Sequence, residues 1–518
     1  MTEQTRVLLI DITGDWLSSE MASEGRSAQA MQKAARPLVS YPIGLMYLAA
    51  SAKKTFGSDI VCTVVSTALD CPTLEGVARL VRNNKPHIVG IRALSMHKDM
   101  YNSIVHMLRN TNEALVLLGG GPYPSSEPIQ ALCGGLVDAV VSGEGEEAFV
   151  GILHEYRSGN RQWHSVANVH TSADSADSIC VKPVSLPLDS LPFPEYSKSL
   201  LYKYEKIKNM SRRYSRHANI VSSRGCPYRC TYCHNIFGKR FRYRSEDNVF
   251  EEIRELYETH GIREFQFIDD IFNLRKPRLI GFFDRVVQSG MPLVFSFPNG
   301  VRGDILDRES IDAMIDGGTR YIYFAVESAS ERIQSLICKN LKLARIAENI
   351  AYAAEKDCVT GGFFMLGFPT ETLEEAQATV KFACETNLTD AYFFMVTHYP
   401  GTEMYDLAVE NGFESGGEEN GNFFATKNGA YAFSQQELSD LSRVARKQFY
   451  FSEKRIDIKR NKLQTFFSPK EITEINAFQI LSCDVTKEDI VRDDQRQYMA
   501  SYFSYAQRMT DMGIRYDF

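Results

Sequence analysis

Three cysteines lie within eight residues in the segment GCPYRCTYCHN, which begins at Gly225. Cys226, Cys230 and Cys233 give the spacing C-x-x-x-C-x-x-C. Thiolates bind zinc and iron–sulfur clusters. A disulfide framework would use an even number of cysteines, and a structural zinc site would use four ligands. The chemistry of this segment therefore depends on what supplies the missing ligand.

Four kinds of site compete for these cysteines. A zinc site would need His234 as its fourth ligand, which is strained because His234 adjoins Cys233. CTYCH matches the C-x-x-C-H haem-attachment pattern, which belongs to exported proteins. A thioredoxin-like pair would use Cys230 and Cys233 and leave Cys226 idle. An iron–sulfur cluster with three thiolate ligands leaves one iron free to bind a substrate.

The composition is that of an ordinary globular protein. A chain of 518 residues predicts roughly two to four domains. A net charge of −7 disfavours a general nucleic-acid binder. No basic start followed by an apolar run opens the chain, and no apolar stretch approaches the ~20 residues of a membrane span. We therefore expect a cytoplasmic protein with mostly reduced cysteines.

Basic residues are concentrated around the cysteines. Twelve Lys or Arg and one acid, Glu205, lie between Leu201 and Arg244. A solvated basic surface would explain this. The alternative is that positive potential, with Arg224 and Arg229 flanking the cysteines, offsets an anionic cofactor or substrate.

The first 155 residues alternate short apolar runs with helical patterns. Each run is typical of a buried parallel strand: RVLLIDI, IVCTVVS, HIVGIRA, ALVLLGG and DAVVSGE. Stretches such as TLEGVARLVRNN fit the crossover helices. This predicts a doubly wound, Rossmann-like α/β domain over residues 1–155, with ligands bound at the carboxyl ends of its strands.

The rest of the chain divides into three parts. Residues 156–215 are rich in Ser, Asp and Pro and predict a linker. Residues 216–408 contain six more strand patterns with helices between them, which predicts a partial (β/α)6 barrel. The cysteines follow the first of these strands. Residues 409–518 predict a mostly helical region, which we expect to close the site.

The cysteine spacing, with Tyr232 before the last cysteine, resembles the motif of the radical S-adenosylmethionine (SAM) superfamily. FIDDIF, FAVESASERIQSLICKN, GGFFMLGFPTET and YPGTEMYDL resemble later segments of the same barrel. The resemblance implies that the three cysteines hold a 4Fe-4S cluster whose fourth iron chelates SAM. Arg302, in NGVRGD, is a further candidate to pair with the SAM carboxylate, with a salt bridge inside the barrel as the alternative. The candidate SAM contacts are Tyr232, Asp270, Arg302, Glu327, Leu366 and Gly367.

Four N-terminal segments, PIGLMYLAA, PHIVGIRALS, LLGGGPYPSS and DAVVSGEGEEAF, resemble the cobalamin-binding domain that precedes the radical domain in one class of this superfamily. The implied cobalamin contacts lie in three loops and are Arg92, Leu94, Ser95, Gly119, Gly120, Gly121, Gly143, Glu144 and Gly145.

Two departures from the pattern concern cobalt. The D-x-H-x-x-G signature is absent, which suggests that cobalt has no protein imidazole ligand; His97 is the nearest alternative. Arg92-Ala93-Leu94 replaces the family's Ser-x-Leu contact, so either the contact to the nucleotide tail differs or Arg92 lies near the lower corrin face.

The resemblance covers roughly residues 5–408 and implies a cobalamin-dependent radical SAM enzyme. We expect a methyltransferase that acts on an unactivated carbon after hydrogen abstraction by the 5′-deoxyadenosyl radical. The alternatives are cyclisation or rearrangement without methyl transfer, and a non-catalytic zinc or iron–sulfur module. No catalytic side chain is assigned. The expected partners are a small-molecule substrate, anionic if the basic segment binds it, and a reducing protein such as flavodoxin or ferredoxin. Neither a nucleic acid nor a membrane span is expected.

Overall fold

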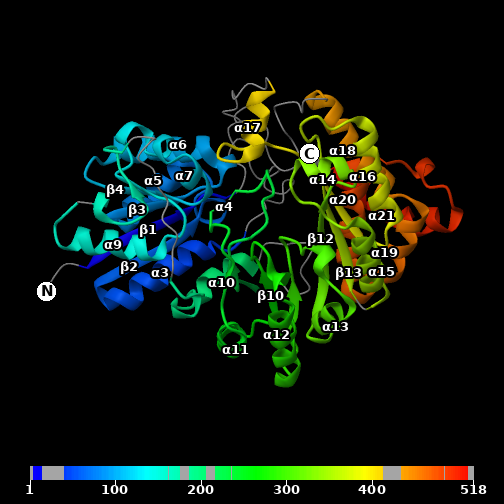
Figure 1. The fold of residues 1–518 in the computed structure, drawn as a ribbon, viewed down its shortest axis with the longest axis horizontal. Coiled ribbons are helices and arrows are strands. Elements are labelled where there is room, and N and C mark those ends of the chain that lie inside the picture. The colour runs from blue at the N-terminus through cyan, green and yellow to red at the C-terminus, as the bar shows by residue number, and fades with distance from the viewer. Residues whose placement is uncertain are drawn as a thin grey trace.

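The computed structural model describes residues 4–13, 40–161, 163–174, 186–205, 216–234, 236–356, 358–411, 433–483 and 485–511. Figure 1 shows an N-terminal domain in blue and cyan, a central green domain, and C-terminal helices in orange and red on the far side of it. Parts of the predicted linker and most of the segment NGFESGGEENGNFF lie outside the described residues. Within the described residues, no helix combines the length and apolar character that crossing a membrane would need.

The N-terminal domain contains a six-stranded sheet in the order β2-β1-β3-β4-β5-β6. All neighbouring strands are parallel except β5 and β6. The strands are β1 (Thr5–Asp11), β2 (Ile60–Ser66), β3 (Ile88–Arg92), β4 (Val116–Gly120), β5 (Ala139–Val141) and β6 (Val169–His170). The first five coincide with the predicted apolar runs, which confirms the doubly wound fold.

Helices cover both faces of this sheet because both faces of its strands are apolar. On one face, α5 (Leu74–Asn84) and α6 (Lys98–Thr111) pack their apolar sides against residues such as Leu8 and Val89. On the other face, α3 (Ile43–Phe56) and α9 (Glu146–Arg157) do the same. The carboxyl ends of β3, β4 and β5 are thereby left for loops.

The predicted linker carries more structure than its composition indicates. Strand β6 lies in it and extends the N-terminal sheet. Helix α10 (Lys198–Glu205) buries Leu201 and Tyr204 in the core shared with the second domain. A two-residue strand and an eight-residue helix are too short to show a clear periodicity, so the composition of Ser, Asp and Pro dominated the prediction.

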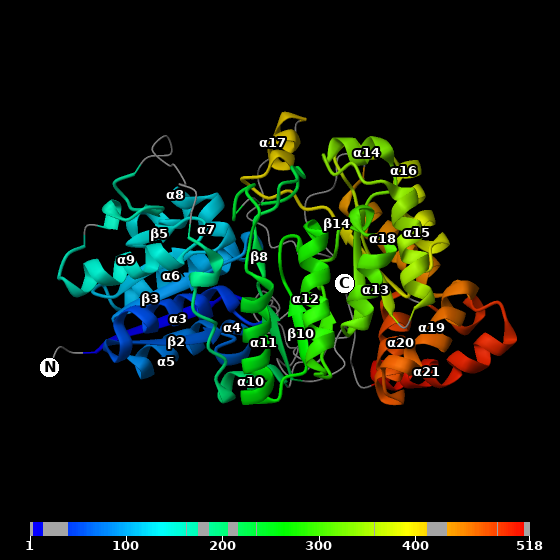
Figure 2. The same ribbon diagram turned by 60° about the horizontal axis from the view of Figure 1, so that its bottom comes forward.

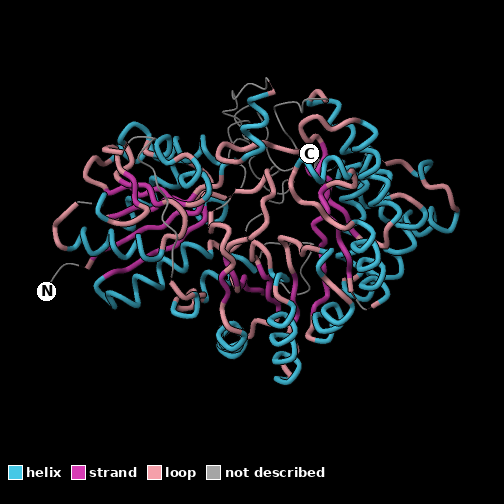
Figure 3. The backbone as a smooth tube through the Cα atoms, viewed as in Figure 1, coloured by secondary structure: helices cyan, strands magenta, loops and turns pink. Residues whose placement is uncertain are grey.

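The central domain is a partial barrel of six parallel strands in the order β14-β13-β12-β11-β10-β7. The strands are β7 (His217–Ile220), β10 (Glu264–Phe267), β11 (Val294–Ser296), β12 (Thr319–Glu327), β13 (Val359–Leu366) and β14 (Asp390–Met395). Each matches a predicted strand, and Figure 3 shows the strands of the two domains as two separate magenta groups.

Helices alternate with these strands along the chain. They are α11 (Glu246–His260), α12 (Lys276–Ser289), α13 (Arg308–Asp316), α14 (Glu331–Leu336), α15 (Leu343–Glu355), α16 (Leu373–Glu385) and α17 (Glu403–Glu410). Helix α17 lies between the barrel and the N-terminal domain in both ribbon views (Figures 1 and 2).

The C-terminal region is helical, as predicted. It contains α18 (Gln435–Tyr450), α19 (Glu453–Phe466), α20 (Pro469–Cys483) and α21 (Asp493–Asp511). Ser442 on α18 donates a hydrogen bond of 3.1 Å to the Phe393 carbonyl of β14. These helices lie on the side of the barrel away from the N-terminal domain (Figures 1 and 2). The expectation that they close the site between the two domains is therefore wrong for the described helices.

Candidate active site

The cysteines lie in a loop held by a short β-hairpin. Residues 225–238, here called the cysteine loop, connect towards β9 (Arg242–Tyr243), which pairs with β8 (Ser223–Arg224). The Cys226 amide donates to the Gly238 carbonyl at 3.3 Å. Gly225 has a φ of +84°, and a Cβ at this position would lie 2.4 Å from the Arg240 carbonyl oxygen. Only glycine permits this close approach of the two hairpin arms.

The cysteine loop is also attached to the barrel. The Thr231 amide donates to the Ile337 carbonyl after α14, and the Met404 amide of α17 donates to the Thr231 carbonyl. Within the loop, a hydrogen bond with the Cys233 thiol lowers the pKa of Cys230 to about 6, and Lys339 acts in the same direction. Cys230 is therefore the most readily ionised of the loop thiols. Among the described residues, no three His, Cys, Asp or Glu side chains are placed to hold one single metal ion.

Tyr232, between the last two cysteines, contacts a buried ion pair. The Lys339 ammonium lies 2.6 Å from the Glu327 carboxylate, and both side chains are less than 10% exposed. The Tyr232 hydroxyl lies 3.3 Å from Glu327 Oε1 and 3.1 Å from Lys339 Nζ. The structure thus brings the predicted residues Tyr232 and Glu327 together. Lys339 was not predicted, because a lone lysine in ICKN carries no signal in the sequence.

Glu327 ends β12 in an unusual conformation. Its φ is +66°, in the left-handed region that residues other than glycine rarely adopt. The register of β12 on β13 is irregular between Ala325 and Glu327. Such a deviation re-aims a side chain, and it accompanies the contact of the carboxylate with Lys339 and Tyr232.

The two aspartates after β10 have different partners. Asp269 is buried and accepts hydrogen bonds from the Ser222 amide and the Ser223 hydroxyl. Asp270, the predicted SAM contact, accepts one from the Gly225 amide at 3.0 Å. Asp269 therefore fixes the start of the hairpin, and Asp270 lies next to the cysteine loop.

Arg302 makes the salt bridge that was the alternative to a SAM contact. Its Nε lies 3.0 Å from Asp304, and its guanidinium stacks on the Tyr228 ring at 3.7 Å from the ring centre. Its NH2 group donates to the Lys339 carbonyl at 2.9 Å. Arg302 supports both the cysteine loop and Lys339, and its pairing with SAM stays a prediction.

Leu366 and Gly367 lie at the carboxyl end of β13. The amides of Gly367 and Phe368 donate to the Glu371 carboxylate at 2.6 and 3.2 Å. Glu371 is fully buried, and burial raises its pKa to about 7. This carboxylate was not predicted as part of the site, and it sets the turn that follows the strand.

The loop after β3 reaches the cysteine loop. Ser95 Oγ lies 3.0 Å from His234 Nε2, which joins a predicted cobalamin loop to the residue after Cys233. Arg92 at the end of β3 forms an ion pair of 2.6 Å with buried Asp11, which is its register partner at the end of β1. Gly121, with a φ of +94°, leaves room for the Arg92 side chain, since a Cβ there would lie 2.8 Å from Arg92 Cγ.

The loop after β5 and the start of α9 contact the central domain through buried ion pairs. Glu144 and Glu146 lie 2.7 and 2.6 Å from Arg224, and all three side chains are at most 8% exposed. Arg242 also pairs with Glu144. The carboxylates raise the pKa of the Arg224 guanidinium against the effect of burial. Because the Glu144 side chain is occupied by arginines, we expect only the backbone of this loop to contact cobalamin.

The remaining residues that were predicted to contact cobalamin lie at or near the carboxyl ends of β3, β4 and β5. The Gly143 amide donates to Ser125 Oγ at 3.0 Å. Gly119 faces its own domain, where a Cβ would lie 2.2 Å from the Tyr101 hydroxyl. Burial lowers the pKa of His97 to about 4. Gly120 is the last residue of β4, and Leu94 and Gly145 lie in the segments that follow β3 and β5.

Most described cations of the basic segment are paired with acids. The pairs beyond Arg224 and Arg242 are Lys203–Asp70, Arg216–Glu205 and Arg244–Glu252. For these five cations, the positive charge is used in ion pairs that join the two domains and the linker or, for Arg244–Glu252, lie within the barrel. These five are therefore neither a wholly solvated surface nor a site for an anionic substrate.

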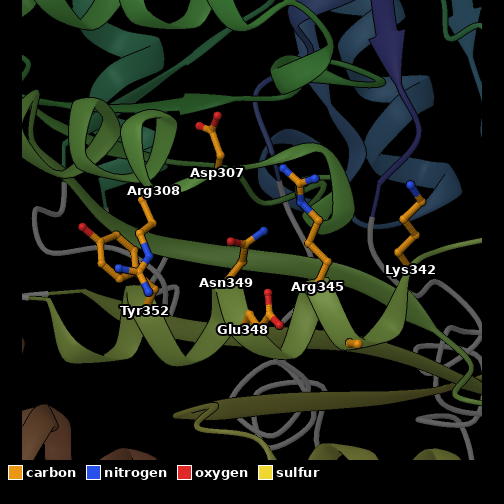
Figure 4. Close-up of a pocket in the computed structure, with 8 residues that line it drawn as sticks. Asp307, Arg308, Lys342, Arg345, Glu348, Asn349 and Tyr352 are labelled. Atoms are coloured by element: carbon orange, nitrogen blue, oxygen red, sulfur yellow. The ribbon is translucent and has the colours of Figure 1, made fainter.

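A separate pocket of about 510 Å³ lies between the starts of α13 and α15 (Figure 4). Its lining includes Asp307, Arg308, Lys342, Arg345 and Tyr352. Arg345 donates to the Leu306 carbonyl, so this cation already has a protein partner. None of the predicted site residues lines the pocket.

Comparison with known proteins identifies the two domains. Residues 220–383 match the Radical SAM superfamily, and residues 33–153 match the B12 binding domain. An uncharacterized methyltransferase of Pyrococcus horikoshii is 30% identical over 377 residues, which cover 71% of this chain and 79% of the relative. The chain belongs to the radical SAM superfamily.

Two further comparisons place this radical SAM protein among those with a B12 binding domain. Cytidylyl-2-hydroxyethylphosphonate methyltransferase of Streptomyces wedmorensis is 28% identical over 434 residues, covering 73% of this chain and 79% of the relative. The structure of the radical SAM methyltransferase TsrM from Kitasatospora setae, with cobalamin and a [4Fe-4S] cluster bound, superposes with a TM-score of 0.61 at 15% identity, covering 97% of this chain and all of that one. This last likeness establishes the fold.

Proposed function

We propose that the protein is a cobalamin-dependent radical SAM enzyme that transfers a methyl group to an unactivated carbon of a small molecule. One observation carries the proposal: the segments at the carboxyl ends of the B12 binding sheet contact the cysteine loop through Ser95–His234, and contact the strand directly before that loop, β8, through the ion pairs of Glu144 and Glu146 with Arg224. A cobalt-bound methyl group and a radical source would therefore share one junction. The names of the two relatives, both methyltransferases, support the reaction type.

The residues present fit the implied cofactors. Cys226, Cys230 and Cys233 are free thiols in one loop at the carboxyl end of the first barrel strand, and Cys230 ionises readily. Three thiolates suit a 4Fe-4S cluster with one open iron. When bound, the cluster and SAM would supply a 5′-deoxyadenosyl radical, and cobalamin would supply the methyl group.

The side chains around the loop position the reactants. Glu327, fixed by Lys339 and Tyr232, presents a carboxylate beside the cysteines as an acceptor for SAM hydroxyl groups. Asp270 accepts a hydrogen bond from the first residue of the cysteine loop, Gly225, and Arg302 stacks on Tyr228 before Cys230. Positioning matters because a primary radical reacts with any C–H bond that it reaches. Helix α17, which adjoins Thr231, is placed to exclude water from the junction.

Substrate-free assays test this proposal. Anaerobically reconstituted protein should contain about four irons and no zinc, retain cobalamin after desalting, and form 5′-deoxyadenosine from SAM and dithionite. With methyl-labelled SAM, the label should appear in methylcobalamin together with S-adenosylhomocysteine. One zinc and no iron would instead indicate a non-catalytic module.

Cys230→Ala should remove the cluster and with it 5′-deoxyadenosine formation. Cys384→Ala, which changes a half-buried thiol on α16 outside the site, is the matched control. A Cys230→Ala protein with parental iron content and rate would refute the assignment. Once a substrate is known, formation of S-adenosylhomocysteine beside 5′-deoxyadenosine distinguishes methylation from cyclisation or rearrangement.

Two finer expectations remain part of the proposal. A substrate anion would have to be held by cations other than Arg224, Arg242 and Arg244, which pair with acids. A cytoplasmic location would keep the cysteine thiols reduced for cluster assembly.

A further inference from the structure

Three described cations next to the cysteines form no ion pair with a described acid. Arg229, Lys239 and Arg240 are exposed, and none of them forms an ion pair with a described residue. We call these three side chains the cationic rim. They differ from the other cations of the basic segment, such as Arg224 and Arg244, which are buried and paired. Pairing with the acids of the described residues therefore does not account for the rim.

The rim is part of the peptide that holds the cysteines. Arg229 precedes Cys230, and Lys239 donates a hydrogen bond of 2.8 Å to the Tyr228 carbonyl. Arg240 contributes the carbonyl against which Gly225 packs. The rim thus consists of one exposed cation in the cysteine loop and two directly after it, and Lys239 is hydrogen-bonded to the loop.

An exposed aromatic side chain extends the surface along the same hairpin. Tyr243 on β9 is 39% exposed, stacks on Phe241, and is covered on one side by the exposed Arg275. Exposed tyrosine and arginine are the residue types enriched in protein interfaces. Glu403 and Asp406 are exposed acidic side chains of α17, the helix whose Met404 amide donates to the Thr231 carbonyl.

We propose that the cationic rim and Tyr243 form the docking surface for an acidic one-electron carrier protein, such as a flavodoxin. The proposal rests on the proposed function, since only a reducible cluster in the cysteine loop needs such a partner. On docking, the carrier would give one electron to the cluster that the cysteine loop would hold, so the carrier is oxidised by one unit and the cluster is reduced by one, with no bond formed or broken. Electron-transfer encounters bury small surfaces. In such encounters complementary charge mainly accelerates association. The chain as a whole carries a net charge of −7, so these few unpaired cations are a local positive surface that can speed association with an acidic protein.

The test compares Arg229→Glu/Arg240→Glu with a matched control, Lys470→Glu/Lys487→Glu, which makes the same charge change on exposed C-terminal residues. Lys239 is left unchanged because it hydrogen-bonds to the cysteine loop. The first measurement is the affinity of each full-length reconstituted protein for an acidic bacterial flavodoxin, titrated with salt. The rim variant should bind about tenfold more weakly and lose most of its salt dependence, and the control should bind like the parent.

The second measurement is 5′-deoxyadenosine formation with two reductants. The rim variant should form 5′-deoxyadenosine slowly with reduced flavodoxin and at the parental rate with dithionite. If its iron content falls, Arg229→Gln/Arg240→Gln replaces it, with the same expectations.

Parental flavodoxin affinity in the rim variant would overturn the proposal, as would an equal loss of flavodoxin affinity in the control variant. Parental flavodoxin affinity with weakened retention on heparin would assign the rim to a polyanion instead. Should the parent form no 5′-deoxyadenosine with dithionite, the proposed function fails, while the affinity measurement still decides the docking surface.

Discussion

Buried cations have opposite surroundings in two regions of this molecule. At the domain junction, Arg224 is held by the carboxylates of Glu144 and Glu146, and Lys339 by that of Glu327. Among the C-terminal helices, Arg455 and Lys459 are equally buried but contact neutral groups. Arg455 donates to backbone carbonyls and stacks on Phe449 at 3.9 Å.

The different surroundings shift the pKa values of these buried cations in opposite directions. Carboxylates raise the pKa of Arg224, whereas burial lowers the pKa of Arg455 to about 10 and that of Lys459 to about 7. Lys459 donates to the amide oxygens of Asn476 and Gln479, which stabilise a cation less than a carboxylate does. The junction therefore keeps fixed charges, and the C-terminal region tolerates a cation that can lose its proton.

The largest effect should come from breaking the junction pair. Arg224→Met leaves Glu146 buried without its cation, which costs about 3–5 kcal/mol. We expect loss of cobalamin retention after desalting and a lower thermal unfolding midpoint. Arg216→Met removes the exposed pair with Glu205 and should cost less than about 1 kcal/mol. If the thermal unfolding midpoint fell equally in Arg224→Met and Arg216→Met, the buried junction pair would be no more important for stability than the exposed pair.

Glu327→Gln should impair SAM use more than folding. The substitution removes the carboxylate that faces Lys339 and Tyr232, and a hydrogen bond to a charged group contributes about 1.5–3 kcal/mol. We expect 5′-deoxyadenosine formation to fall by about tenfold or more at parental iron content. Glu327→Gln/Lys339→Met should restore the unfolding midpoint without restoring activity. Recovered activity in the double variant would exclude a role of Glu327 beyond neutralising Lys339.

Lys459 predicts a pH dependence of stability in the C-terminal region. Its folded pKa, about 7, lies below the ordinary value of 10.5, so the unfolded chain binds more protons between those pH values. Stability should therefore rise with pH across that window, by at most about 1.4 kcal/mol per pH unit, and the penalty is complete below pH 7. Lys459→Met should lack this rise. Unfolding midpoints measured from pH 6 to 9 test it, and parallel curves would contradict it.

Ser95→Ala should give the smallest effect at the junction. It removes one hydrogen bond to His234, worth about 0.5–1.5 kcal/mol, and leaves the ion pairs intact. Cobalamin affinity should fall by no more than about tenfold. Ser504→Ala, at an exposed hydroxyl on α21, is the control. If Ser95→Ala lost as much cobalamin binding as Arg224→Met, Ser95 would have a role beyond its hydrogen bond to His234.

The sequence predicts the strands well because each is an apolar run between turn signals. The runs RVLLIDI and EFQFID both became strands at the expected positions, β1 and β10. The cysteine loop was also predictable, since its ligands lie within one short segment. Contacts between distant segments were not predictable. Arg224 lies 80 residues from Glu144 in the sequence, and the residues around each of them do not indicate which distant residue it contacts.

Because Arg224 joins the loop after β5 to the cysteine loop, we expect loading of the two cofactors to be thermodynamically linked. Arg224 stands two residues before Cys226, so whatever orders the β5 loop also orders the start of the metal-binding peptide. Linkage is reciprocal: corrin uptake should favour cluster assembly to the same degree that cluster assembly favours corrin uptake. Cells starved of vitamin B12 should consequently yield protein that is poor in iron as well.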